Sequence, residues 1–293
     1  METIALRTAR WHAVVDAQLG GALLELSHGS EPVLRPATQD GIRRAGVRAS
    51  ACYPLVPFAN RIGYGRMAVA GREYVLRANF PPEPHAVHGI GWQLPWTVVE
   101  QDRTAAELLL RYAGDSPGEW PFAFDAHQRF ELRPSGLRIT LSLVNRDRSA
   151  WPGGIGLHPF FPVGSGQTLQ FEADGAWQNG PDQLPRRRVA GAEWDFRQPR
   201  RIADLDLDND FYHWNGLVRI AGGSAGTVRI AASEVFPVLR VFTPPGRGFI
   251  AVEPVSHAAD AVNRAAEDAS GNRLLAPGES LCGRVCIELE GCA

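Results

Sequence analysis

The stretch Leu137-Arg138-Ile139-Thr140-Leu141-Ser142-Leu143-Val144 alternates apolar and polar side chains over most of its length. Because successive side chains of a β-strand point to opposite faces of a sheet, this alternation predicts a half-buried strand. Short apolar runs between turn-forming residues recur along the chain and predict further strands and hairpins. They cover residues 11–17, 22–26, 67–76, 96–100, 107–112, 127–132, 217–220, 227–231, 238–243, 249–252 and 281–289.

Helical periodicity is nearly absent from the sequence. The best helix candidate is the short, alanine-rich segment 258–268. The chain has 31 glycines and 22 prolines among 293 residues, which suits many turns. We therefore expect an all-β fold, a large antiparallel sandwich or barrel, with residues 1–293 forming a single domain. Residues 181–199, which include Arg186-Arg187-Arg188, are expected to form a solvated loop.

The charge balance limits the classes of partner. A net charge of −2 arises from 30 basic and 32 acidic residues. It gives no electrostatic reason to expect nucleic acid or an anionic membrane as a partner, and it fits a small neutral molecule. No stretch approaches the 18 apolar residues of a membrane span, and the first residues do not resemble a signal peptide. We expect a cytoplasmic protein.

The four cysteines, Cys52, Cys282, Cys286 and Cys292, do not have the spacing of a structural zinc site. Free thiols in a reducing compartment are therefore expected. Cys282 and Cys286 are separated by an even number of residues, so they should lie on one face of a strand.

A histidine stands between a glycine-rich approach and a proline-aromatic exit in Gly156-Leu157-His158-Pro159-Phe160-Phe161-Pro162. Apolar neighbours desolvate an imidazole and shift its pKa, which favours a role in proton transfer. The alternative is a structural histidine at the end of a strand. Glu253 follows the apolar run 249–252, where partial burial would raise the pKa of a general base. A salt-bridged glutamate at a strand end is the alternative.

Three further segments carry polar groups that suit a sugar. Arg61 follows a rigid proline-aromatic stretch and offers a fork of donors, although it could also be a surface arginine in a turn. The segment 85–96 places His85 and His88 near Trp92 and Trp96. Aromatic faces can stack on a sugar ring, whereas the alternatives are core tryptophans with a capping histidine, or a pair of metal ligands without an obvious third.

The third segment, 205–214, contains Asp208, Asn209 and Asp210. It lacks the glycine and the terminal glutamate of a calcium loop. A carboxylate that accepts hydrogen bonds from sugar hydroxyls is one interpretation, and a turn-forming cluster is the other.

In their order along the chain, these motifs resemble the aldose 1-epimerase (galactose mutarotase) family. The resemblance rests on Pro-Phe-Ala-Asn-Arg-Ile at 57–62, His-Gly at 88–89 with Trp92 and Trp96, Gly-Leu-His-Pro-Phe-Phe at 156–161, Asp-Asn-Asp-Phe at 208–211, Glu-Pro at 253–254 and Asp-Ala-Val-Asn at 260–263. It implies a β-sandwich of many strands (a supersandwich), an open cleft on the sheet surface, and no metal or organic cofactor.

The resemblance also implies roles for individual residues. His158 resembles the general acid, Glu253 the general base, and His88 a second histidine on the oxygen atoms of the sugar. Arg61 and an aspartate resemble the residues that bind ring hydroxyls. The family spacing Asp-x-x-Phe selects Asp208, with Asp210 as the alternative.

One departure from the family pattern follows the base. The galactose-specific branch has a Thr-Gln-Asn segment where this chain has Pro254-Val255-Ser256-His257. It resembles a bacterial branch, and His257 could itself contact the sugar.

The expected function is an aldose 1-epimerase, an isomerase of carbohydrate metabolism that interconverts the α and β anomers of a free aldose. Reference pKa values would leave Glu253 charged and His158 titrating near neutrality. One alternative is a hexose-6-phosphate 1-epimerase that uses residues 186–188 or Arg200-Arg201 at the rim of the cleft. The other is a carbohydrate-binding module without turnover. The aldose, the oligomeric state and the role of His85 stay open.

Overall fold

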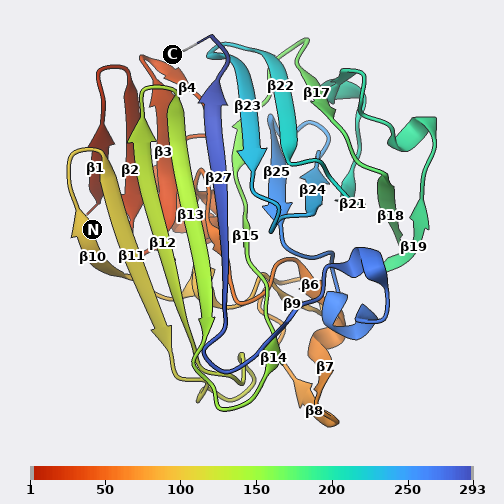
Figure 1. Ribbon diagram of the computed structural model, residues 1–293. Coiled ribbons are helices and arrows are strands. Elements are labelled where there is room, and N and C mark those ends of the chain that lie inside the picture. Colours follow the sequence, from red (N-terminus) through yellow and green to blue (C-terminus); the bar gives the residue numbers. More distant parts are fainter. Residues whose placement is uncertain (1–2, 292–293) are drawn as a thin grey trace.

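The computed structural model describes residues 3–291 and consists mainly of antiparallel strands. Figure 1 shows two large sheets stacked face to face, with the nine-stranded sheet in front of the eight-stranded one. A four-stranded sheet from the N-terminal segment adjoins them. The predicted all-β antiparallel sandwich is therefore confirmed.

The two large sheets take strands from distant parts of the chain. The nine-stranded sheet has the order β10 (Thr97–Gln101), β11 (Ala105–Tyr112), β12 (Phe124–Arg133), β13 (Gly136–Asn145), β27 (Ser280–Leu289), β23 (Gly226–Ala232), β22 (Leu217–Gly223), β17 (Thr168–Phe171) and β20 (Arg200–Arg201). The eight-stranded sheet has the order β19 (Pro185–Val189), β18 (Gly175–Asn179), β21 (Asp208–Tyr212), β24 (Val238–Phe242), β25 (Phe249–Val255), β15 (Gly156–Leu157) and β5 (Pro54–Leu55), with β16 (Phe160–Pro162) paired to β25.

The remaining strands form smaller sheets. The four-stranded sheet runs β1 (Ile4–Arg7), β2 (Trp11–Asp16), β3 (Ala22–His28) and β4 (Glu31–Pro32). Three two-stranded ribbons pair β14 (Trp151–Pro152) with β26 (Leu274–Leu275), β6 (Arg61–Ile62) with β9 (Ala86–Val87), and β7 (Arg66–Val69) with β8 (Arg72–Val75).

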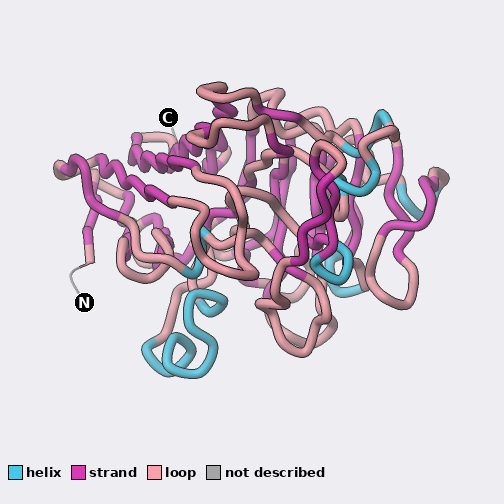
Figure 2. Tube along the Cα trace, turned by 90° about the horizontal axis from the view of Figure 1, so that it is seen from below, coloured by secondary structure: helices cyan, strands magenta, loops and turns pink. Residues whose placement is uncertain are grey.

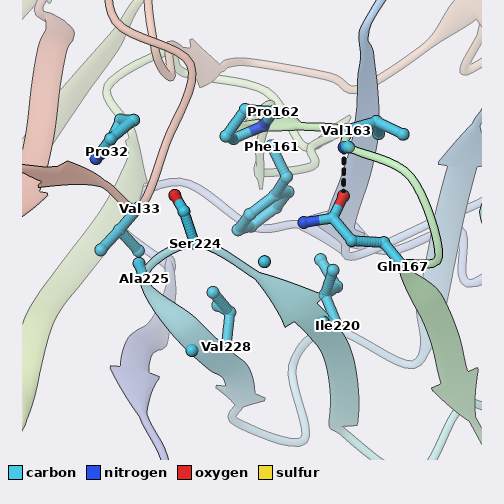
Figure 3. A pocket seen from close by; sticks show the side chains of 14 residues that line it. Pro32, Val33, Phe161, Pro162, Val163, Gln167, Ile220, Ser224, Ala225 and Val228 are labelled. Atoms are coloured by element: carbon cyan, nitrogen blue, oxygen red, sulfur yellow. Dashed lines mark hydrogen bonds between the residues drawn. The ribbon is translucent and has the colours of Figure 1, made fainter.

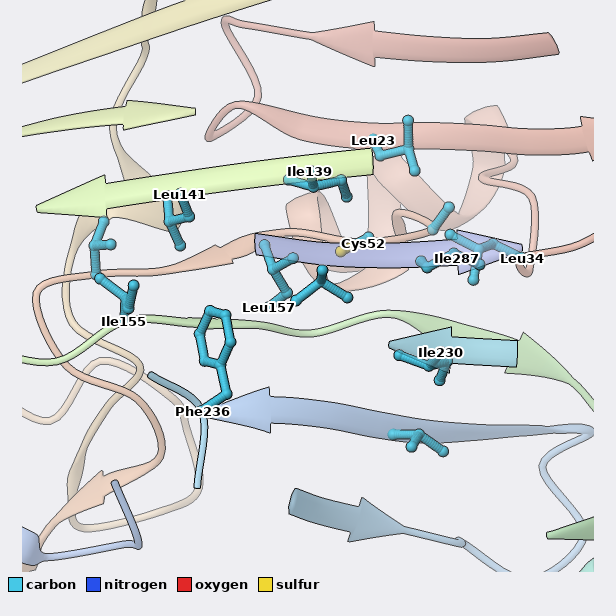
Figure 4. Close-up of a cluster of buried hydrophobic side chains, with 14 of the residues drawn as sticks. Leu23, Leu34, Cys52, Ile139, Leu141, Ile155, Leu157, Ile230, Phe236 and Ile287 are labelled. Carbon is cyan, nitrogen blue, oxygen red and sulfur yellow. The ribbon is translucent and has the colours of Figure 1, made fainter. Parts of the chain in front are cut away.

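The core lies between the stacked sheets. Along β13, Leu137, Ile139, Leu141 and Leu143 are buried, whereas the side chains between them are partly exposed. The alternation predicted for this stretch is thus confirmed. Figure 4 shows Ile139 and Leu141 of one sheet and Leu157 beside Phe236 pointing into the same apolar layer.

One α-helix was not expected. Helix α1 (Gln39–Ala45) begins after Thr38, whose side chain accepts a hydrogen bond from the Gly41 backbone N–H. Helix α1 buries none of its residues, so its sequence has no apolar stripe that could have revealed it. With the 3₁₀ turn η1 (Gly46–Ala49), it projects from one side of the sandwich as the largest cyan coil in Figure 2.

The helix predicted at 258–268 is wrong. The segment holds two separate 3₁₀ turns, η6 (Ala261–Arg264) and η7 (Asp268–Ser270). Asp260 has a left-handed backbone (φ 56°), which is incompatible with a continuous helix. Its carboxylate instead accepts hydrogen bonds from the backbone N–H of Gly63 (2.8 Å) and the Asn263 side chain (2.7 Å). The other 3₁₀ turns are η2 (Gly63–Gly65), η3 (Gly91–Gln93), η4 (Ala192–Trp194) and η5 (Ile202–Asp204).

The loop predicted at 181–199 is also partly wrong. It contains strand β19 at the edge of the eight-stranded sheet, followed by η4. The side chains of Arg186, Arg187 and Arg188 are exposed, as expected of a solvated run. Charged side chains on an edge strand are common, because they discourage pairing with another strand.

The thiols that the structure describes are free. Cys52 is buried, and Cys282 and Cys286 lie on the outer face of β27, as their even spacing predicts. Cys292 lies outside the described residues. Among residues 3–291, no helix is long and apolar enough to cross a bilayer.

We expect Leu141→Ala to lower the free energy of unfolding by about 2–5 kcal/mol, because it opens a cavity between the two sheets. Ser142→Ala, the next residue on the outer face of β13, should change it by less than about 0.5 kcal/mol. Urea unfolding followed by tryptophan fluorescence measures both. Equal effects would contradict the burial of Leu141.

Candidate active site

Two of the predicted residues meet on neighbouring strands of the eight-stranded sheet. His158 follows β15, Glu253 lies on β25, and these strands pair with Gly156 opposite Val255. The His158 Nε2 and Glu253 Oε1 atoms are 3.4 Å apart, with 9% and 3% of the two side chains exposed. A histidine and a carboxyl group almost a hundred residues apart thus form a buried pair.

Aromatic rings surround His158. Tyr53 stacks on it with ring centroids 4.6 Å apart, and Phe160 packs at 4.4 Å. The ring of His88 meets it edge-on at 5.3 Å. These contacts exclude water from the imidazole and hold its plane.

Burial changes the protonation of the pair. It lowers the pKa of His158 to about 3, with a further contribution from the positive charge of Arg35. Burial also raises the pKa of Glu253 to about 8, against the opposing charge of Arg240. At neutral pH the pair therefore consists of a neutral imidazole and a protonated carboxyl group. The reference pKa values used for the sequence-based expectation apply to solvated groups, and neither group is solvated.

Two aspartates of β21 share one buried arginine of β24. Arg240 Nη1 donates to Asp210 Oδ1 at 3.1 Å, and Arg240 Nη2 donates to Asp208 Oδ1. Asp210 is fully buried, whereas the side chain of Asp208 is 29% exposed. Asp208 is therefore the aspartate that a ligand can reach.

Arg240 was missed in the sequence. The sequence does contain a sign of its role, because Arg240 is the single charged residue within the apolar run 238–242. A charge that is buried in such a run needs a partner. Burial alone would raise the pKa of Asp208, but the charges of Arg240 and Arg61 outweigh it and lower that pKa.

Arg61 lies beside Asp208, but most donors of its guanidinium group are already bonded to other residues. Its Nε and Nη2 donate to the two carboxylate oxygens of Glu83 at 2.6 and 2.7 Å, and Nη1 donates to Asn60 Oδ1 at 3.2 Å. The longer contact of 3.4 Å joins Nη2 to Asp208 Oδ2. Glu83 stands in the proline-rich segment Pro81-Pro82-Glu83-Pro84, which gave no sign of this role.

The histidines of the segment 85–96 separate into two kinds. His88 Nδ1 accepts a hydrogen bond from the Asn60 backbone N–H at 3.0 Å, which leaves Nε2 as the N–H that can face a ligand. Burial lowers the pKa of His88 well below its ordinary value, so it is neutral. Trp92 and Trp96 are buried, and Trp92 packs against Tyr53 with ring centroids 5.9 Å apart.

His85 and His257 are held by internal hydrogen bonds. His85 Nδ1 accepts from the Tyr64 backbone N–H at 3.0 Å, and its Nε2 lies 2.9 Å from the Asp182 carbonyl oxygen. His257 Nε2 accepts from the Ala59 backbone N–H at 3.1 Å, and its Nδ1 lies 2.8 Å from the next backbone carbonyl. Neither ring keeps a free nitrogen, so the expectation that His257 could contact a sugar is not supported.

One group of donors could hold a metal ion. Among the described residues, His88, His158 and Glu253 each offer a ligand atom, and these atoms lie within 4.8 Å of one another. Two imidazoles and a carboxylate suit zinc. An ion there would take the same lone pairs that His158 and Glu253 need for proton transfer. The pairing of His85 with His88 considered from sequence is not supported, because both nitrogens of His85 are already bonded.

A cavity of about 270 Å³ lies elsewhere, between the loop after β16 and the β22–β23 hairpin. Figure 3 shows its mainly apolar lining, which includes Phe161, Ile220 and Val228, with the Gln167 amide at one side. None of the five predicted site residues lines this cavity.

Comparison with known proteins decides the family. The model of the aldose 1-epimerase family matches residues 2–287. The chain belongs to the aldose 1-epimerase family. The family resemblance inferred from the motifs is thereby confirmed, and the observed sandwich is its galactose mutarotase-like fold.

Several relatives share most of their length with this aldose 1-epimerase family member. The uncharacterised Escherichia coli K12 protein YphB is 29% identical over 287 residues, which cover 92% of this chain and 93% of that protein. A galactose mutarotase-like protein from Clostridium acetobutylicum has a TM-score of 0.81 at 18% identity, with 97% and 94% of the two chains covered. A galactose 1-epimerase from Lactobacillus acidophilus has a TM-score of 0.77 at 19% identity, with 98% and 93% covered. At such identities the two structures support the fold alone.

We expect Arg240→Met to lower the free energy of unfolding by about 3–5 kcal/mol, because it leaves the buried carboxylate of Asp210 without its charged partner. Arg219→Met is the matched control: Arg219 is half exposed in an ion pair with Glu290, and its loss should cost less than about 1 kcal/mol. Denaturant unfolding compares the two. A cost for Arg240→Met no larger than that of the control would refute a structural role for the Arg240 ion pairs.

Proposed function

We propose that the protein is a mutarotase, which interconverts the α and β anomers of an aldose by opening and reclosing the sugar ring. The observation that carries the proposal is the buried His158–Glu253 pair, 3.4 Å apart. Ring opening needs an acid and a base on either side of one small centre, and this pair supplies both. Membership in the aldose 1-epimerase family supports a sugar as the substrate.

In the proposed reaction, Glu253 takes the proton from the C1 hydroxyl while His158 gives a proton to the ring oxygen O5. The C1–O5 bond breaks, the open-chain aldehyde rotates about C1–C2, and the ring closes on the other face with the roles reversed. Each positioned proton-transfer group typically contributes about 10²–10⁴-fold. In the free protein the one transferable proton of the pair lies on Glu253, so it first moves to His158, whose Nε2 is 3.4 Å from Glu253 Oε1. Ring opening then passes that proton from His158 to O5, while Glu253 takes the proton of the C1 hydroxyl.

The pKa shifts of His158 and Glu253 agree with a pair that shares one proton. After ring opening, His158 is neutral and Glu253 is protonated, which is also the form that burial favours in the free protein. The desolvated site therefore stabilises the charge state of the open-chain intermediate relative to a separated ion pair. The positive charge of Arg240 opposes the effect of burial on Glu253 and so keeps its ionised form within reach.

The other predicted residues orient the sugar. The exposed part of Asp208 can accept from ring hydroxyls, and His88 Nε2 can donate to an oxygen near the reacting centre. Arg61 would act mainly through Asp208, since most of its donors are used by Glu83 and Asn60.

The cytoplasmic location and the single domain stay predictions. Of the arginines first considered for a phosphosugar, Arg186-Arg187-Arg188 lie on the edge strand β19 of the eight-stranded sheet, and Arg200-Arg201 on β20 of the other large sheet.

We expect Glu253→Gln to lower the rate of anomer exchange by about 10²–10⁴-fold, because the amide cannot accept the C1 proton. Glu100→Gln, on the exposed strand β10, is the matched control. Polarimetry of a freshly dissolved hexose measures exchange, and calorimetry measures binding. Exchange near the wild-type rate would overturn the assignment of the base. Binding without exchange in the wild-type protein would instead favour a carbohydrate-binding module.

We expect kcat/KM for anomer exchange to stay level across neutral pH and to fall as pH rises through about 8. The reason is that Glu253, with a pKa raised to about 8, then loses the only transferable proton of the pair, since His158 is already neutral. Initial rates by polarimetry, corrected for uncatalysed exchange, give the profile. A rate that increases through the same range would contradict the shared proton.

A further inference from the structure

Two arginines beside the catalytic pair have no carboxylate partner. The first, Arg35, stacks its guanidinium over Phe160 at 3.9 Å and over Phe249 at 4.5 Å. Its Nη2 donates to the carbonyl oxygens of Arg48 and Ser50 at 3.0 and 2.9 Å. Within residues 3–291, its Nε and Nη1 have no acceptor. Arg35 is thus held in place with part of its donor fork unused.

The second arginine, Arg48, lies on η1. Its guanidinium covers the ring of Phe80 at 4.8 Å, and Phe80 meets His88 edge-on at 6.2 Å. Its Nε donates to the Ala45 carbonyl oxygen at 3.4 Å, and both of its Nη atoms have no acceptor in the described part of the chain. Arg43 and Arg44, on the neighbouring helix α1, are by contrast paired with Asp40.

A third donor, Tyr53, packs near the ring that Arg35 covers, since the Tyr53 and Phe160 centroids are 6.1 Å apart. Tyr53, which stacks on His158, is buried, and its hydroxyl has no hydrogen-bond partner among residues 3–291. Burial raises the pKa of Tyr53, while the positive charges of Arg48 and Arg35 oppose that rise. The charges of both guanidinium groups therefore influence the Tyr53 hydroxyl.

The site as a whole has an uneven distribution of charge. The carboxylates of Asp208, Asp210 and Glu83 are all paired with Arg61 or Arg240. At the other end, Arg35 and Arg48 face no acid in the described residues. Confined guanidinium groups without a counter-charge are suited to bind an anion by charge-assisted hydrogen bonds.

We propose that Arg35, Arg48 and Tyr53 bind an anionic group, a phosphate or a carboxylate, carried by the exocyclic carbon of the sugar substrate. The inference rests on the proposed function and names its substrate class. The position agrees with sugar chemistry: His158 serves the ring oxygen, and the carbon bonded to that oxygen bears the exocyclic carbon. Phe160 packs against both His158 and Arg35, and Tyr53 stacks on His158, so two of the three donors adjoin the proposed proton donor to the ring oxygen.

The test compares anomer exchange of glucose, glucose 6-phosphate and glucuronate by NMR exchange spectroscopy, corrected for uncatalysed rates. We expect the wild-type protein to have a higher kcat/KM for one of the two charged sugars than for glucose. Whether that sugar is glucose 6-phosphate or glucuronate identifies the anionic group as a phosphate or a carboxylate. Arg48→Gln should lower that charged-to-neutral ratio by about 10–100-fold, since it removes a charge-assisted contact. Arg44→Gln makes the same change of charge on the exposed helix and should leave the ratio unchanged.

Two results would overturn the proposal: a wild-type preference for glucose over both charged sugars, or an unchanged ratio in Arg48→Gln. Direct binding separates this failure from that of the proposed function. Calorimetry with Glu253→Gln protein should show that glucose 6-phosphate or glucuronate binds more tightly than glucose, and that adding Arg48→Gln removes the difference. If that difference is present but no sugar is exchanged, the anion site stands and the mutarotase assignment fails. If neither is observed, both fail.

Discussion

The carboxylate of Asp210 joins the parts of the chain that build the site. It accepts hydrogen bonds from Arg240 on β24, from the Asn60 side chain and from the Ala259 backbone N–H. Asn60 in turn fixes His88 through its backbone N–H and Arg61 through its side chain. A buried carboxylate must have all of its oxygens satisfied, so one fully buried residue determines how three segments approach each other. The site residues are placed by this internal network.

Much of the fold could be predicted from the sequence, because a strand with one buried face alternates apolar and polar residues. The alternation along 137–144 reports one buried face directly, and the long runs at 107–112, 127–132 and 281–289 all lie within observed strands. Helix α1 shows no comparable pattern, since it is short and none of its residues is buried. Asp260 shows the converse: alanines around it suggest a helix, but its contact with Gly63, far away in sequence, sets its backbone.

The candidate site was predictable to the extent that its chemistry lies in motifs. His158 and Glu253 stand in distinctive surroundings, and the structure places them side by side. Glu83 gave no signal, and Arg240 was marked only by its charge within an apolar run, because ion pairing depends on distance in space. The same holds for protonation. A pKa reflects burial and neighbouring charges, so values for solvated groups do not apply to a pair that is almost completely buried.

The arginines of β19 have a consequence for the behaviour of the molecule in a crowded solution. β19 is the last strand of the eight-stranded sheet, so one side of its backbone is open to pairing. Arg186 is paired with Asp182, so Arg187 and Arg188 leave this edge with an excess of positive charge. Two copies of the edge would repel each other, which opposes the joining of two sheets into one. At the end of the other large sheet, β10 has a bulge between Val98 and Glu100, which interrupts the regular edge. A protein built on two large sheets thereby carries its own protection against edge-to-edge aggregation.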